Sequence, residues 1–146
     1  MTPVELSCKS EYALLALLEL AAHYDCGEPL QIRQIAAQQS IPDRYLEQLL
    51  ATLRRSGIIR SQRGAKGGYM LARAPQAITL LDIVECLEGS EGQPIATDVP
   101  KLAVSLITEI WQEADQAANA VLKKYTLQTL CDRRDARQQL DIMYYI

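Results

Sequence analysis

The sequence predicts a mainly α-helical protein, in which a compact helical domain carrying one β-hairpin is followed by a long C-terminal helix. Three observations support this prediction. Apolar residues recur at helical spacing from about residue 8 to residue 53, and a glycine cluster at 64–68 separates two short β-type runs. Residues 101–125 then form a pattern without Gly or Pro. With 146 residues, 49% of them hydrophobic, the chain is long enough to bury a single core.

Three helices are expected before the hairpin. Ser7 is the expected N-cap of the first helix, which should run to about Tyr24 and stop at Cys26-Gly27. The second should span about eight residues and end at 38–40. The third should begin with Pro42 as its first residue, because that position needs no backbone N–H. Its apolar face is expected to consist of Leu46, Leu49, Leu50 and Leu53.

A β-hairpin should follow, with strands at 58–61 and 68–71 and a glycine-rich tip between them. Thr79 and Asp82 have the spacing of a capping box, which predicts a fourth helix ending at Gly89. Helix, short helix, helix and then hairpin is the order of a winged helix-turn-helix. In that fold the third helix is placed for the major groove of DNA and the hairpin, or wing, reaches the adjoining backbone or minor groove.

The charge distribution agrees with such a surface, although the net charge is −3. Residues 48–81 contain no acid, and eight acids lie between Glu91 and Asp141. A locally basic surface is sufficient for DNA binding because contacts to phosphates supply most of the affinity. A pure protein-interaction module would not need this acid-free stretch. Its six basic residues are Arg54, Arg55, Arg60, Arg63, Lys66 and Arg73.

Composition divides the chain into a DNA-binding domain at 1–89, a linker loop at 90–100 and a dimerisation helix with a C-terminal segment at 101–146. The long helix is apolar over so much of its surface that its own chain is too short to cover it, which predicts a homodimer. The alternative is that it folds back on its own domain. The pattern assigns no role to the tail at 141–146. The residues expected at the dimer interface are Leu106, Ile107, Ile110, Trp111, Ala114, Ala117 and Val121.

These segments resemble the Rrf2 family of bacterial transcriptional regulators over nearly the whole chain. The most specific likeness lies in the combination of Tyr45-Leu46-Glu47-Gln48-Leu49 with Arg63-Gly64-Ala65-Lys66-Gly67-Gly68-Tyr69 at their observed separation. Further matching segments are Leu6-Ser7, Tyr12-Ala13-Leu14, Ile41-Pro42, Leu53 to Ile58, Ile83-Val84 and the long helix with Trp111.

The resemblance implies that Arg44, Tyr45, Glu47 and Gln48 face DNA and that Arg63 enters the minor groove, where negative potential is concentrated. Glu47 is expected to discriminate between bases, because a carboxylate accepts from cytosine but is repelled by phosphate. A solvated surface acid is the alternative for Glu47. The full set of DNA-binding candidates is Arg33, Arg44, Tyr45, Glu47, Gln48, Arg54, Arg55, Arg63, Gly64, Lys66, Gly67, Gly68 and Tyr69.

Cluster-binding members of the family carry three cysteines in the loop before the dimer helix, whereas residues 89–101 here contain neither Cys nor His. The usual cluster site is therefore absent, and the sequence assigns no cofactor. A non-standard iron–sulfur or redox site could use Cys86 and Cys131, with Glu11 at the position where some family members recruit an acidic ligand from the partner subunit. For each of the four cysteines alone, the simpler interpretation is a small buried hydrophobe or a surface thiol.

The sequence argues against other classes. His23 is the only histidine and has no catalytic motif around it, and the glycines at 64–68 lack the form of a phosphate-binding loop, so an enzyme is not expected. No apolar run reaches the length of a membrane span and no secretory signal is visible, which predicts a cytosolic protein. The expected function is a homodimeric regulator that reads double-stranded DNA. Its signal could be a small molecule, a partner protein or cysteine oxidation.

Overall fold

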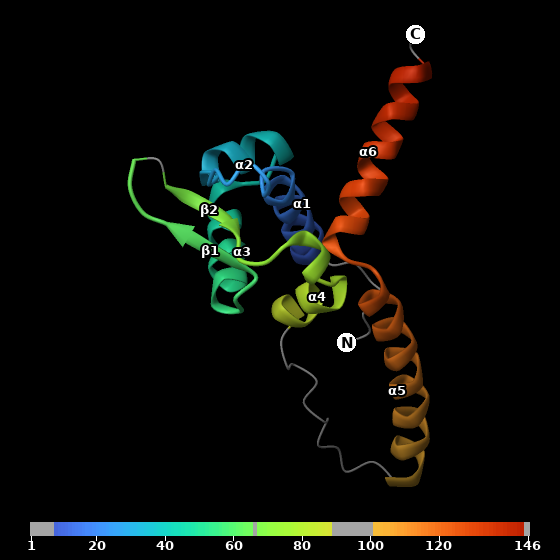
Figure 1. Cartoon of the computed structure of the whole chain (residues 1–146). Helices are drawn as coiled ribbons and strands as arrows, with labels where there is room; N and C mark the ends of the chain where they lie inside the picture. The colour runs from blue at the N-terminus through green and yellow to red at the C-terminus, as the bar shows by residue number, and fades with distance from the viewer. Residues whose placement is uncertain (1–7, 66, 89–100, 145–146) are drawn as a thin grey trace.

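The computed structural model describes residues 8–65, 67–88 and 101–144. Six α-helices, one 3-10 helix and one β-hairpin occur in these residues (Figure 1). The sequence pattern predicted the hairpin and the first five α-helices, but neither the 3-10 helix nor the last α-helix. Their order and bounds are α1 (Cys8–Ala22), α2 (Ile32–Gln39), α3 (Asp43–Arg55), β1 (Ile59–Gln62), β2 (Gly68–Leu71), η1 (Pro75–Ala77), α4 (Leu80–Glu88), α5 (Lys101–Lys124) and α6 (Leu127–Tyr144).

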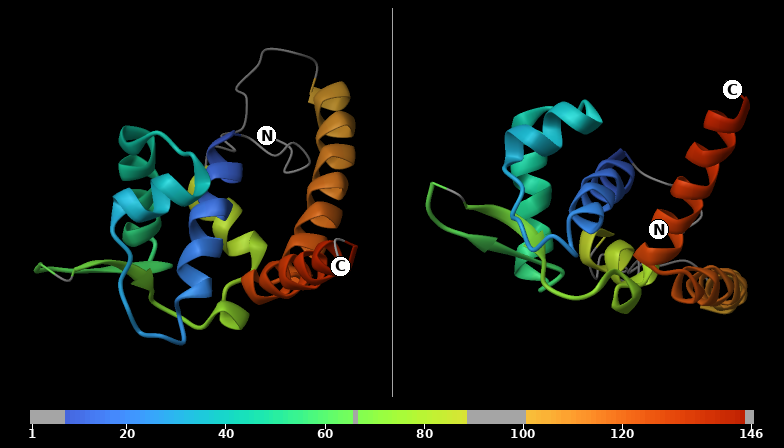
Figure 2. Two further views of the ribbon diagram at one scale, coloured as in Figure 1. Left: turned by 90° about the horizontal axis from the view of Figure 1, so that it is seen from above. Right: turned by 45° about the horizontal axis from the view of Figure 1, so that its top comes forward.

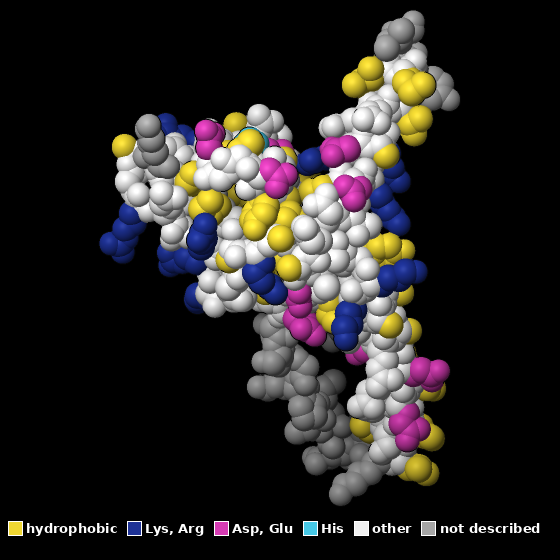
Figure 3. Space-filling model, in the orientation of Figure 1, with side chains coloured by type: hydrophobic (Ala, Val, Ile, Leu, Met, Phe, Trp, Pro, Cys, Tyr) yellow, Lys and Arg dark blue, Asp and Glu magenta, His cyan; other side chains and the backbone are white. Residues whose placement is uncertain are grey.

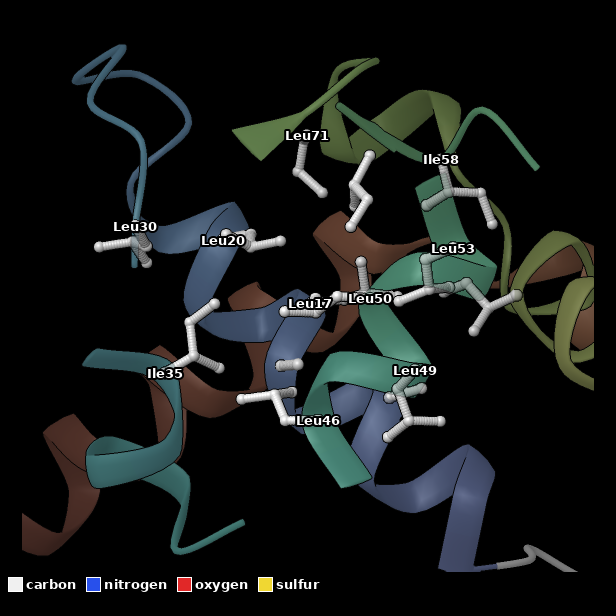
Figure 4. Close-up of a cluster of buried hydrophobic side chains, with 14 of the residues drawn as sticks. Leu17, Leu20, Leu30, Ile35, Leu46, Leu49, Leu50, Leu53, Ile58 and Leu71 are labelled. Carbon is white, nitrogen blue, oxygen red and sulfur yellow. The ribbon is translucent and has the colours of Figure 1, made fainter. Parts of the chain in front are cut away.

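The core of the N-terminal domain is formed by the faces of α1, α2 and α3 that the helical spacing predicted (Figure 4). On α3, the four buried leucines repeat every three or four residues, so they lie on one face and leave the opposite face to solvent. Ser40 adopts a left-handed conformation, with φ 55°, that ends α2 and turns the chain toward α3. Pro42 lies one residue before α3 and acts as its N-cap residue, so the expectation that it is the first helical residue is off by one position.

The hairpin is antiparallel, with Ile59 paired to Leu71 and Gln62 paired to Gly68. Its first strand begins one residue later than the pattern predicted. A connection that the sequence did not reveal fixes the other edge of β2. The Leu30 N–H donates to the Tyr69 carbonyl at 2.9 Å, and the Tyr69 N–H donates to the Leu30 carbonyl at 2.7 Å. The wing is thereby attached to the segment before α2.

Two glycines of the wing have steric reasons to be glycine. Gly68 has a φ of 154°, and a Cβ there would collide with the carbonyl of Leu30. A Cβ on Gly67 would collide with the carbonyl oxygen of Gln62, so the tip closes only without a side chain at this position. Gly64 also has a positive φ, of 113°, but a Cβ there would meet open space.

We expect Gly68→Ala to loosen the attachment of the wing. The new methyl group must displace the Leu30 backbone, which should lower the free energy of unfolding by about 2 kcal/mol more than Gly64→Ala does. Gly64→Ala is the matched control because it shares the positive φ without the collision. Urea unfolding of both variants measures the difference, and equal losses of stability would contradict the steric explanation.

The predicted capping box is present at the start of α4. The Asp82 N–H donates to Thr79 Oγ1 at 3.0 Å, and the Thr79 N–H donates to Asp82 Oδ2 at 3.1 Å. Ile83 and Leu87 then face the core, and the α4 helix packs against α1 and α3. The expected end of this helix at Gly89 and the linker at 90–100 lie outside the described residues, as does the predicted N-cap Ser7.

Helices α5 and α6 form an arm along one side of the domain and diverge from their junction, with α5 and the outer part of α6 extending beyond the body (Figures 1 and 2). The long helix ends at Lys124, close to the predicted end. The junction is fastened to the domain because the Leu80 N–H donates to the Tyr125 carbonyl and the Leu127 N–H donates to the Ile78 carbonyl, both at 2.9 Å. Leu127, the first residue of α6, is fully buried in the same core as α1 and α3.

Candidate nucleic-acid interface

The exposed face of α3 carries the polar side chains predicted to read DNA. Arg44, Glu47 and Gln48 are exposed, and Leu46 and Leu49 on the opposite face hold the helix to the core. Since α2 packs against α3 and both lie on the side of the molecule away from α5 and α6, this face is open to a large partner (Figure 2). The arrangement has the geometry of a helix-turn-helix with α3 as its outer helix.

Tyr45, one of the predicted DNA-binding residues, makes a packing contact within the domain. Its ring is half-buried and meets the ring of Tyr12 on α1 edge-to-face, with the ring centroids 5.4 Å apart and an interplanar angle of 74°. Such a contact stabilises beyond the area it buries, so Tyr45 braces α3 against α1. Beside it lies a cleft of about 460 Å³ whose lining includes Lys9, Gln48 and Arg55. The sequence did not indicate that Lys9 lies next to these candidates.

Basic side chains continue from the end of α3 onto the wing. Arg54 and Arg55 are exposed in the last turn of α3, where the guanidinium of Arg54 donates to Ser61 Oγ on β1 at 3.4 Å. Arg60 and Arg63 are exposed on the hairpin, and Arg33 is exposed on α2. Dark-blue side chains gather on the wing side of the molecule in Figure 3. Lys66 lies outside the described residues.

The remaining wing candidates divide into two kinds. Gly64 is exposed at the tip, where backbone could approach backbone. Gly67 is buried, and Gly68 and Tyr69 are half-buried next to the core and the Leu30 segment. The structure therefore gives these three residues a role in shaping the wing.

Within one chain, the two cysteines and the acid considered for a cluster do not converge. Cys86 on α4 points its thiol at the carbonyl of Thr52 on α3 at 3.6 Å, Cys131 is buried on α6, and Glu11 is exposed on α1. Within the described part of the chain, no three His, Cys, Asp or Glu side chains are grouped to hold a metal ion. The described residues of one chain thus do not fit an iron–sulfur cluster.

We expect the thiols to differ strongly in reactivity. Burial raises the pKa of the Cys131 thiol, so a smaller fraction of it is thiolate at neutral pH. Since the thiolate is the reactive form, Cys131 should react slowly. Cys8 and Cys26 are exposed. Labelling of native protein at neutral pH, read by mass spectrometry, should modify Cys8 and Cys26 first and Cys131 last. Equal labelling rates at all sites would contradict this order, and unfolded protein provides the control.

No helix among the described residues is long and apolar enough to span a membrane.

The fold and this surface define the class of winged helix-turn-helix DNA-binding transcriptional regulators. Residues 6–133 match the profile of the Rrf2 family, which is described as an iron-dependent transcriptional regulator. The chain belongs to the Rrf2 family, and the fold class and family expected from the sequence are confirmed.

Individual relatives agree. The chain is 36% identical over 144 residues to the HTH-type transcriptional regulator CymR of Bacillus subtilis, covering 98% of this chain and 100% of that protein. It is 43% identical over 129 residues to a Synechocystis sp. protein described as an HTH-type transcriptional regulator, with 87% of each chain covered. These relatives are named as transcriptional regulators and not as enzymes, which confirms the expectation from the sequence that the chain is a regulator and not an enzyme.

Solved structures of transcriptional regulators have the same fold as this chain. IscR of T. potens superposes with a TM-score of 0.76 at 33% identity, covering 93% of this chain and 92% of that one. The structure of CymR, described as the global cysteine regulator of B. subtilis, superposes with a TM-score of 0.73 at 34% identity, covering 89% of this chain and 98% of that one.

Proposed function

We propose that this Rrf2-family regulator is a homodimer that reads a two-part DNA site, with α3 of each subunit in the major groove and each wing at the adjoining minor groove. The observation that carries the proposal is the exposed polar face of α3 beside an exposed basic hairpin. Residues 1–89 then bind DNA, and residues 101–146 supply the dimer interface.

The expected division of labour follows from the chemistry of the side chains. Arg44 and Gln48 can donate to base edges, and Glu47 can accept from the amino group of cytosine. Arg54 and Arg55 at the end of α3, Arg63 on the wing and Arg33 on α2 supply phosphate or minor-groove contacts, which fix the position of the protein without reading sequence.

The proposed dimer is supported by the surface of α5. All seven residues predicted for the interface are exposed in the single chain, and Ile110 and Trp111 retain 61% and 55% of their surface. The helix contacts its own domain mainly through α4, with a different face that includes Val104, Ala118 and Leu122. An apolar stripe of this length is rare on monomers, so a second copy of α5 is the partner that covers it in a twofold arrangement.

The proposal is tested by selection from a random duplex library. The purified chain should enrich sequences with inverted repeats, because a twofold dimer presents two equivalent recognition helices. The half-site centres should lie about 10 base pairs apart, or a multiple of that. Enrichment of a single, non-repeated half-site would contradict the dimeric arrangement, and no enrichment over input would contradict sequence-specific reading.

A further inference from the structure

A polar cleft of about 490 Å³ lies on a different part of the molecule from the DNA-binding surface. Its walls come from the end of α1 and the following turn, from η1, and from the first turns of α6. Its size falls in the range of small-molecule sites in proteins, about 300–1,000 Å³. The side chains that matter for its chemistry are Tyr24, Asp25, Gln76, Cys131, Arg134 and Asp135.

The cleft is held in place by buried contacts at its base. Pro75 of η1 and Cys131 of α6 line the cleft and are buried, and Leu127 anchors the same end of α6 in the core. The hydrogen bonds of Leu80 to Tyr125 and of Leu127 to Ile78 fix η1 and α6 relative to each other. The space between α1 and α6 is therefore part of the packed fold, which suits a preformed ligand site.

Charges of both signs face this cleft. Arg134 Nε lies 3.5 Å from Asp135 Oδ1, and this is a long contact between neighbouring residues on α6. Asp25 contributes a carboxylate from the opposite wall and has no ion-pair partner among the described residues. In Figure 3 acidic and basic side chains gather where α6 meets the body. The guanidinium of Arg134 has five N–H donors, so its one ion pair leaves donors for a carboxylate.

The mixture of charges selects the chemical class of ligand. A phosphate or dicarboxylate would meet one guanidinium and two carboxylates. The net negative charge of these three groups would repel such an anion. A simple amine would leave the donors of Arg134 unused. A zwitterion satisfies both, because its carboxylate can accept from Arg134 while its ammonium group donates to Asp25 and Asp135.

We propose that the cleft between α1, η1 and α6 binds a small zwitterion of the free α-amino acid class. Such a ligand would touch the DNA-binding domain through α1 and η1 and the arm through α6. It would therefore tie together the two parts that, in the proposed function, contact DNA and the second subunit. The site itself requires only the contacts of a single chain.

The test uses the full chain without DNA, so its outcome is independent of the proposed DNA reading. The twenty standard amino acids, each with its amide and its N-acetyl derivative, are titrated by calorimetry and by thermal unfolding. At least one free amino acid should bind and raise the melting temperature. Both derivatives should bind at least about tenfold more weakly, because each lacks one of the two charges.

Variants locate the site. Arg134→Ala and Asp25→Asn should each weaken binding at least about tenfold, since each removes one charge-assisted contact. Arg137→Ala is the control, because Arg137 is an exposed arginine on the same helix that does not line the cleft. The proposal is overturned if no free amino acid binds at millimolar concentration, if the amides bind equally well, or if binding survives Arg134→Ala unchanged.

Discussion

Ile110→Glu should convert the protein from a dimer to a monomer. Ile110 lies at the centre of the apolar stripe on α5 and is 61% exposed in the single chain, so a partner must cover it in the proposed dimer. The twofold axis would place two new carboxylates in one interface. Burying an unpaired charge costs about 3–5 kcal/mol, which corresponds to a decrease of more than about 100-fold in dimer affinity.

Sedimentation velocity at micromolar concentration measures the change, with Gln116→Glu as the matched control. Gln116 lies on the same exposed helix but on its polar side, so the same carboxylate there should leave the dimer intact. Circular dichroism should show equal helix content in both variants, because the single chain leaves both positions in solvent. A wild-type protein that sediments as a monomer, or an Ile110→Glu variant that remains dimeric, would overturn the proposed interface.

The helices of the N-terminal domain could be predicted because their signals are local. The leucines of α3 repeat within 13 residues, and the Thr79–Asp82 capping box is complete within four positions. The long helix was equally predictable, because residues 101–124 contain neither Gly nor Pro and keep one apolar stripe. In each case the residues that determine the element are close together in the chain.

Helix α6 could not be predicted in this way. Between Cys131 and Leu140 its sequence is almost entirely polar, so it shows no apolar stripe that continues along its length. Its first turn is fixed instead by tertiary packing, since Leu127 enters the core and Cys131 is buried beside α1 and η1. The absence of Gly and Pro from residues 126–144 was the one available signal.

In the candidate DNA-binding surface, too, local features could be predicted from the sequence and tertiary contacts could not. The resemblance implied that Arg44, Glu47 and Gln48 lie at the surface, and their exposure agrees with the helical repeat of the leucines that bury the opposite face of α3. The steric need for Gly68 did not follow, since its close neighbour Leu30 lies 38 positions earlier in the chain. Likewise, the packing of Tyr45 on Tyr12 depends on how α1 and α3 meet.

Removing Glu47 should relax sequence preference, whereas removing Arg63 should weaken binding to DNA of any sequence. Arg63 is exposed on the wing, so Arg63→Ala should weaken binding to most duplexes. It should also reduce the slope of log K against log salt by about 0.9 for each phosphate that the variant no longer neutralises. Glu47 gains nothing from phosphate, so Glu47→Ala should relax specificity by about 1–3 kcal/mol per half-site while non-specific binding stays equal or becomes stronger.

Fluorescence anisotropy on the selected site and on random DNA, at two salt concentrations, separates these effects. Glu85→Ala and Arg137→Ala are charge-matched controls, because Glu85 is exposed on α4 and Arg137 is exposed on α6, outside the basic stretch at 48–81. If Glu47→Ala changes affinity for both DNAs by the same factor as Glu85→Ala, then Glu47 is a solvated surface acid. A salt slope that Arg63→Ala leaves unchanged would remove the wing from the interface. If Glu47 fails its own test, Arg44 and Gln48 remain as the residues of α3 proposed to read bases.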